Sequence, residues 1–303
     1  MATDARVLEQ HALRPELSRL DRSRRFLSSF IRHKPLGTFG AIVVLILVAM
    51  AAFPTLFTGD DPNTGVLSDR FQGPSLNHWF GTDNIGRDLF TRIVYGARNS
   101  IIIGFGVVAI SSTVATALGV VSGYYGGWFD MLVQRLVDIG IALPGLIFII
   151  LVVTSLQQIP VSLRIILAVG ILSALSSSRV IRGAAISAKQ NQYVEAARVV
   201  GASDMRIIVR HVVPNVIPVV IIGASIQVGG AVLVESSLSF LGYGVQPPTA
   251  SWGRMLNDAR EYLVQYPHLA LFPGLVIFFT VYSLNMLGDA LRDVLDPRLR
   301  GSR

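Results

Sequence analysis

The apolar residues of this chain fall into six long stretches, separated by polar and charged segments. Each stretch is close to the ~20 residues that a helix needs to cross the ~30 Å hydrocarbon layer of a membrane. The pattern therefore predicts an all-α integral membrane protein with six transmembrane helices. The predicted spans are residues 36–57, 100–121, 137–156, 159–178, 215–237 and 268–287. The fourth is the weakest, because Arg164 and five serines lower its hydrophobicity, and without it the polar segment that follows would lie outside.

Local composition adds detail to these spans. Pro144 predicts a kink in the third span. The segment before the second span contains HWFGTDNIGRD (78–88), which predicts an ordered external loop that feeds a helix. Residues 236–253 are rich in Gly, Pro and aromatics, so they should form an outer loop instead of continuing the fifth helix. The fifth span is expected to pack closely through three glycines, Gly223, Gly229 and Gly230.

The basic residues predict which way the spans run. Nineteen of the 26 Lys and Arg lie in four segments, 1–35, 122–136, 179–213 and 290–303. An excess of Lys and Arg marks the cytoplasmic side, so both termini are expected inside. Residues 1–35 read as a basic amphipathic helix on the membrane surface, with a disordered basic tail as the alternative. Residues 36–289 then form the six-helix transmembrane domain, and residues 290–303 form a cytoplasmic tail.

Composition excludes several classes of function. With 51% apolar residues, 15% charged residues and a mean hydropathy of +0.56, the chain is built for lipid, and orientation explains its net charge of +7 without nucleic acid. No cysteine is present and the five histidines lack HExxH spacing, so we expect no metal site, no catalytic residues and no cofactor. The only lysines, Lys34 and Lys189, are outside any GxxxxGK[ST] phosphate loop. If ATP drives this protein, another chain hydrolyses it.

A polar island between the fourth and fifth spans, residues 193–215, holds the clearest motif. Residues 190–200 favour a helix, and the paired Ala196 and Ala197 after Glu195 leave a shallow surface that another protein could approach closely. Gly201 is the expected residue for the left-handed turn that ends this helix.

The rest of the island, after Gly201, contains residues that favour the start of a helix. Ser203 or Asp204 can cap a second short helix, and Pro214 suits the first turn of a third. The segment is therefore predicted to be a bent helical plug, with an ordinary surface helix-turn-helix as the alternative.

This spacing resembles the EAA loop of ATP-binding-cassette (ABC) importer permeases, from which it departs at His211 and Val213. The segments GTDNIGRD, RIVYGAR and GDALRDVLDPRLRG are similar to the peptide and nickel subfamily of these permeases. The resemblance covers nearly everything after residue 30.

The resemblance implies a multi-pass permease subunit in the bacterial cytoplasmic (inner) membrane, part of an ATP-driven importer of di- or oligopeptides. Its partners would be a homologous second permease subunit, two ABC ATPase subunits or domains, and an extracytoplasmic solute-binding protein. A cytoplasmic coupling loop, residues 183–213, would dock on the ATPase. The residues expected to act in coupling are Glu195, Ala196, Ala197, Gly201, Asp204 and Pro214. Cargo stays open between peptides, nickel chelates and other small solutes, and a secondary transporter or channel is the alternative class.

Glu235 is an ionisable residue near the outer end of the fifth span. A charge at that depth normally faces protein or water, which places Glu235 at the outer rim of a central path. The alternative is an interfacial carboxylate that snorkels toward the membrane surface.

Overall fold

The computed structural model describes residues 34–295, so the predicted N-terminal amphipathic helix and the end of the tail lie outside the described residues. Within that range the chain is helical, as the apolar pattern predicts. The helices are α3 (Pro35–Ala52), α4 (Leu89–Tyr125), α5 (Gly127–Ala142), α6 (Gly145–Ser155), α7 (Val161–Lys189), α8 (Gln192–Val199), α9 (Asp204–Ile207), α10 (Val213–Phe240), α11 (Trp252–Ala259) and α12 (His268–Leu295).

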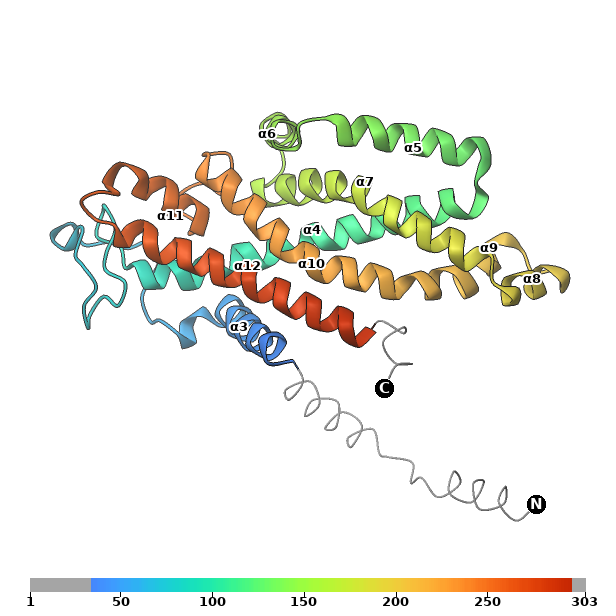
Figure 1. Ribbon diagram of the computed structural model, residues 1–303. Helices are drawn as coiled ribbons and strands as arrows, with labels where there is room; N and C mark the ends of the chain where they lie inside the picture. The colour runs from blue at the N-terminus through green and yellow to red at the C-terminus, as the bar shows by residue number, and fades with distance from the viewer. Residues whose placement is uncertain (1–33, 296–303) are drawn as a thin grey trace, which may run out of the picture.

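Four long helices, α4, α7, α10 and α12, run lengthwise through the molecule and form its body (Figure 1). The coupling loop with α8 and α9 lies at one end, and α11 with the loop before α4 lies at the other. The start of α3 reaches the far end of α12, where Lys34 forms an ion pair with Asp293. The chain therefore brings the beginning of its first span and the end of its last span together.

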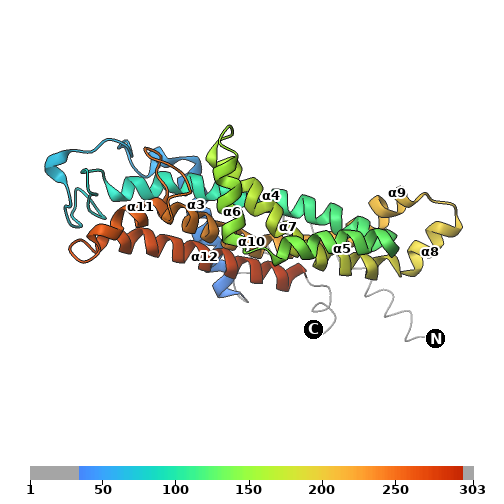
Figure 2. The same ribbon diagram turned by 90° about the horizontal axis from the view of Figure 1, so that it is seen from above.

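Five of the helices are long and apolar enough to cross a membrane, and α5 with α6 make a sixth span only if they count as one. The predicted kink at Pro144 is wrong in degree, because α5 and α6 meet at 90°. Leu143 and Pro144 both adopt extended backbone angles, since a proline disfavours helical geometry in the residue before it. Figure 2 shows α6 crossing the direction of the long helices.

Two further details of the fifth span differ from expectation. The helix α10 continues to Phe240, five residues into the predicted outer loop, because Leu238 and Ser239 are buried against neighbouring elements. A side chain added at Gly223 or Gly230 would meet no atom of residues 34–295 within 4 Å, so these two glycines form no close-packing face within that range. Of the three glycines, Gly229 alone packs against another described helix, α12.

Glycine contacts instead bring α4 and α7 together. A Cβ at Gly119 would lie 2.6 Å from the carbonyl oxygen of Ser178, and one at Gly123 would lie 2.9 Å from that of Arg182. Small residues allow such backbone approach in lipid, where dispersion contacts replace the hydrophobic effect as the force between helices. The α4–α7 pair therefore depends on glycine along the half that lies next to the coupling loop.

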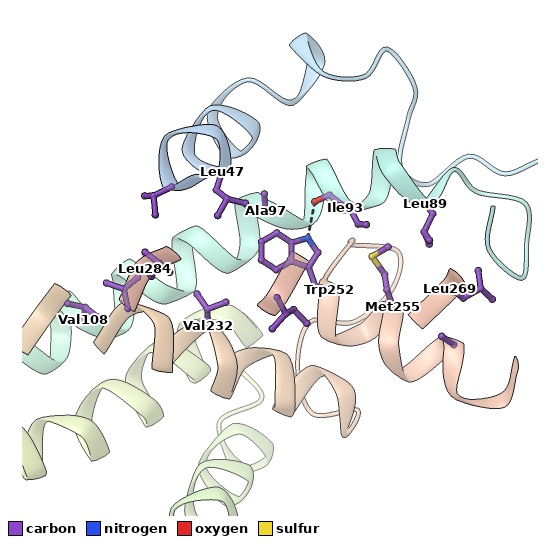
Figure 3. Close-up of a cluster of buried hydrophobic side chains, with 14 residues drawn as sticks. Leu47, Leu89, Ile93, Ala97, Val108, Val232, Trp252, Met255, Leu269 and Leu284 are labelled. Carbon is purple, nitrogen blue, oxygen red and sulfur yellow. Dashed lines mark hydrogen bonds between the residues drawn. The ribbon is translucent and has the colours of Figure 1, made fainter. Parts of the chain in front are cut away.

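The end of the molecule opposite the coupling loop is held by a buried aromatic residue. The side chain of Trp252, at the start of α11, is 0% exposed, and its indole N–H donates to the carbonyl of Ile93 at 2.9 Å (Figure 3). Its ring also fills the space beside Gly96, where a Cβ would lie 2.8 Å from the indole. The contact fixes α11 against the first turns of α4.

The loop before α4 is ordered by charge pairing, as the GTDNIGRD segment predicts. Asp83 accepts hydrogen bonds from the backbone N–H groups of Ile85 and Arg87, and its carboxylate pairs with the Arg87 side chain at 2.6 Å. Asp88 then caps α4 by accepting from the N–H of Thr91 at 2.7 Å. These hydrogen bonds and the ion pair give the loop before α4 a defined conformation.

The distribution of basic residues predicts that the coupling loop is cytoplasmic. Because the native chain has no cysteine, single cysteines report accessibility cleanly. We expect Ser203→Cys to stay unlabelled by an impermeant thiol reagent added to intact cells, and Ser68→Cys, exposed in the outer loop, to be labelled. Labelling of Ser203→Cys from outside would contradict the orientation.

Candidate functional site

The coupling loop, residues 183–213, includes the last turns of α7, which ends at Lys189, and leads into α10 through the short helices α8 and α9. Between α8 and α9, Gly201 has φ +83°, a left-handed conformation that a β-branched side chain resists. No atom lies within 4 Å of the position of an added Cβ there, so backbone conformation alone demands glycine. The turn that the sequence predicts at Gly201 is confirmed.

The second and third helices form one continuous helical segment. A π-helical turn at Ile208–Val212 joins α9 to α10, and Pro214 lies in the first turn of α10, as expected. The ring of Pro214 would collide with the carbonyl of residue 210 in a regular α-helix, and the wider turn before it accommodates the proline. Within residues 193–215, the helical segments are therefore interrupted at the turn around Gly201.

Buried apolar side chains anchor the coupling loop to the bundle. Val194 on α8 and Ile207 on α9 are both 0% exposed, and they share one hydrophobic cluster with Ala185 and Ala188 of α7. Val216 extends the same cluster into α10. The loop is thus a packed part of the fold, and its other face is left outward.

That outward face carries the motif residues. Glu195 and Ala196 are exposed, whereas Ala197 is half-buried and packs against the hydrophobic cluster behind the loop. Beside the two exposed residues, Val199 and Val200 are each 88% exposed, and Met205 is 66% exposed. We call the five exposed residues, Glu195, Ala196, Val199, Val200 and Met205, the docking face. Sequence reasoning missed its apolar half, although three large apolar residues in a polar, charged segment were a visible signal of an interaction surface.

Tyr124, near the end of α4, contacts the coupling loop through its hydroxyl, its ring and its backbone carbonyl. Its hydroxyl donates to the carboxylate of Asp204 at 2.6 Å. The charged ends of Lys189 and Arg198 lie 5.6 and 5.7 Å from the centre of its ring, within the range of cation–π attraction. Lys189 also donates to the backbone carbonyl of Tyr124.

This contact changes the expected role of Asp204. Ser203 occupies the N-cap position of α9 but its side chain makes no capping hydrogen bond, and the carboxylate of Asp204 is engaged by Tyr124. The pair therefore ties the loop to α4, which is distant in sequence. Tyr124 is a contact residue of the coupling loop that no local motif in the loop indicates.

Glu235 lies at the opposite end of α10 and is 0% exposed. One carboxylate oxygen accepts from the hydroxyls of Ser239 at 2.8 Å and Ser251 at 3.1 Å, and the other lies 3.4 Å from that of Ser236. The snorkelling alternative is wrong, because the carboxylate faces protein. Ser251 occupies the N-cap position of α11, so any effect of Glu235 on a path would act through the placement of α11.

The chain was compared with proteins of known family. The family model described as "Binding-protein-dependent transport system inner membrane component" matches residues 115–301. A glutathione transport system permease protein of Escherichia coli is 41% identical over 271 residues, covering 89% of each chain. A dipeptide transport system permease protein of Alkalihalophilus pseudofirmus is 39% identical, covering 89% of this chain and 88% of its own.

A solved structure of an amino acid ABC transporter with histidines covers 68% of this chain at 16% identity and a TM-score of 0.46. That likeness adds nothing to the assignment.

The Tyr124–Asp204 contact generates a test of how the loop is held. Tyr124→Phe removes the hydroxyl but keeps the ring, so we expect the loop to open more readily by about 1 kcal/mol, or roughly fivefold. The measurement is the rate at which trypsin cleaves the coupling loop of the purified protein. Arg198 and Arg206 are trypsin cleavage sites in this loop. Tyr125→Phe is the matched control, because Tyr125 is 52% exposed. Equal rates for Tyr124→Phe and the native chain would contradict the contact.

Proposed function

The chain belongs to the family of inner membrane components of binding-protein-dependent transport systems, and we propose that it is the permease subunit of an ATP-driven importer of di- or oligopeptides. The observation that carries this proposal is the near full-length similarity to two permeases named for short peptides, glutathione and dipeptides. Both solutes have a free amino group and free carboxyl groups on a short backbone.

Members of this family work with separate ATPase subunits, another permease and a binding protein. For this chain we propose one homologous second permease subunit, two ABC ATPase subunits or domains, and an extracytoplasmic solute-binding protein. The six-helix domain of residues 36–289 would form half of the translocation path. The subunit itself would not hydrolyse ATP, since its two lysines lie outside any phosphate loop.

The docking face supports the proposal that the coupling loop meets an ATPase. Glu195 would make a charge-assisted hydrogen bond to a basic or amide group of the partner. Ala196 and Ala197 leave room for close approach, and Val199 and Val200 would be desolvated on contact.

The attachment of the coupling loop supports a role in transmitting motion. The loop joins α7 to α10 directly, and Tyr124 ties it to α4. A push on the docking face would therefore move three long helices together. This follows from the packing of Val194 and Ile207, because a loosely tethered loop would absorb the displacement instead.

Peptide import is tested by reconstituting the chain with its partner permease, ATPases and binding protein in liposomes. We expect uptake of a labelled dipeptide that requires ATP inside the liposomes and is lost when either permease is omitted. ATP-dependent uptake of another small solute, with no uptake or competition by dipeptides or longer peptides, would contradict the proposed cargo.

The coupling assignment is tested in the same complex with variants of the loop. Glu195→Ala should weaken ATPase docking by about 1.5–3 kcal/mol, roughly tenfold to hundredfold. Gly201→Val should be more damaging, because it redirects α9. Both should leave the amount of membrane-inserted protein unchanged, since neither residue faces lipid.

Gly73→Val is the matched control, because Gly73 is an outer-loop glycine with open space around it and no left-handed backbone angle. The measurements are uptake and ATPase stimulation per inserted complex. Normal uptake by a Glu195→Ala, Gly201→Val double variant at normal abundance would overturn the assignment.

A further inference from the structure

The outer end contains a polar pocket that no sequence motif indicates. It has a volume of about 630 Å³ and lies between the loop after α3, the second to fourth turns of α4 and the loop before α11. Its size is within the ~300–1,000 Å³ of typical small-molecule pockets. The loop after α3 contributes Asp60 and Asp61, and α4 contributes Arg98. Further polar groups come from Tyr95, Asn99 and Thr249.

The walls of this outer pocket are fixed by hydrogen bonds behind them. Arg92, which is 2% exposed, donates to the carbonyl of Pro62 at 2.9 Å and so holds the wall that carries both aspartates. Asn99 donates to the carbonyl of Ala250 at 2.7 Å and holds the opposite loop against α4. Binding would therefore require little ordering of the protein.

The charged groups of the pocket are available to a ligand. Arg98 is exposed, and no carboxylate of residues 34–295 lies within ion-pair distance of its guanidinium. Asp60 likewise pairs with no cation of the described chain, and Asp61 uses one oxygen to accept the N–H of Asn63. A pocket with separate unpaired charges of both signs is complementary to a ligand that also carries both.

We propose that the outer pocket binds the main-chain charges of a short zwitterionic peptide, with its carboxylate at Arg98 and its ammonium group at Asp60 and Asp61. The planar guanidinium matches a carboxylate, and the aspartates accept hydrogen bonds from an ammonium. Ile102, half exposed, offers an apolar surface to a peptide side chain. The pocket thus recognises the free termini that all linear peptides share.

This inference rests on the proposed peptide importer and names where on this subunit the cargo is held. The charged groups are open to solvent, so screening keeps the interaction weak. Weak binding suits a site from which the peptide must leave toward the path. The proposed contacts of Arg98, Asp60 and Asp61 are with the peptide termini and not with its side chains. Selection among peptides is therefore left to the binding protein.

The test uses Thr249→Cys as a reporter in the pocket, in the complex of both permeases and the ATPases reconstituted in nanodiscs without binding protein. The rate of thiol labelling of this chain is measured against increasing dialanine. We expect dialanine to slow labelling, and N-acetyl-dialanine and dialanine amide, which each lack one terminal charge, to need about tenfold higher concentration for the same protection.

Arg98→Gln should raise the half-protective dialanine concentration about tenfold and remove the difference between dialanine and its amide. The double variant Asp60→Asn, Asp61→Asn should also raise the half-protective dialanine concentration about tenfold, and it should remove the difference between dialanine and N-acetyl-dialanine. Arg70→Gln is the matched control, because Arg70 is an exposed outer-loop arginine that does not line the pocket. Its dialanine protection should equal that of the otherwise native chain.

Absence of protection by dialanine, equal protection by the blocked peptides, or unchanged protection in Arg98→Gln would each overturn the pocket assignment. Failure of the importer gives a different result. Normal ATP-driven peptide uptake by the native complex in liposomes with its binding protein, together with no protection at Thr249→Cys in the nanodiscs, overturns the pocket alone. Absence of peptide uptake in the liposomes overturns the proposed function on which the inference rests.

Discussion

The close approach of α4 to α7 is the constraint on which the other parts of the structure depend. Gly119 and Gly123 bring α4 against the backbone of α7 at Ser178 and Arg182. This approach puts Tyr124, one residue beyond Gly123, within reach of the coupling loop that leaves the end of α7. A larger residue at either glycine would separate the two helices, and the contacts of Tyr124 with Lys189, Arg198 and Asp204 would be lost with them.

Residues whose effect is local could be read from the sequence. Gly201 and Pro214 behave as expected because a left-handed turn and a helix start are decided within a few residues. The apolar spans were predictable for a similar reason, since lipid requires each crossing segment to satisfy its backbone within one helix. The order of the outer loop likewise followed from the charges and turn residues of GTDNIGRD.

What the sequence left undecided depends on contacts between distant segments. Glu235 is enclosed by hydroxyls that include Ser251, sixteen residues away, and no local pattern reveals that neighbour. The 90° turn at Pro144 was underestimated because proline permits either a kink or a break, and packing around α5 and α6 decides between them. The prediction for the glycines of α10 was wrong for Gly223 and Gly230, because composition shows where a helix has small residues but does not show which other helix packs against them.

The length of α4 has a mechanical consequence. Its 37 residues form a rod of about 55 Å, well beyond the ~30 Å hydrocarbon layer. One end is clamped by Trp252 at the outer surface and the other carries Tyr124 under the coupling loop. The clamp at Ile93 lies roughly 45 Å from Tyr124, so a tilt of about 10° around it would move the inner tip by roughly 8 Å. If the subunit couples as proposed, the helix would act as a lever arm, in which the displacement of the inner tip grows with its distance from the outer clamp.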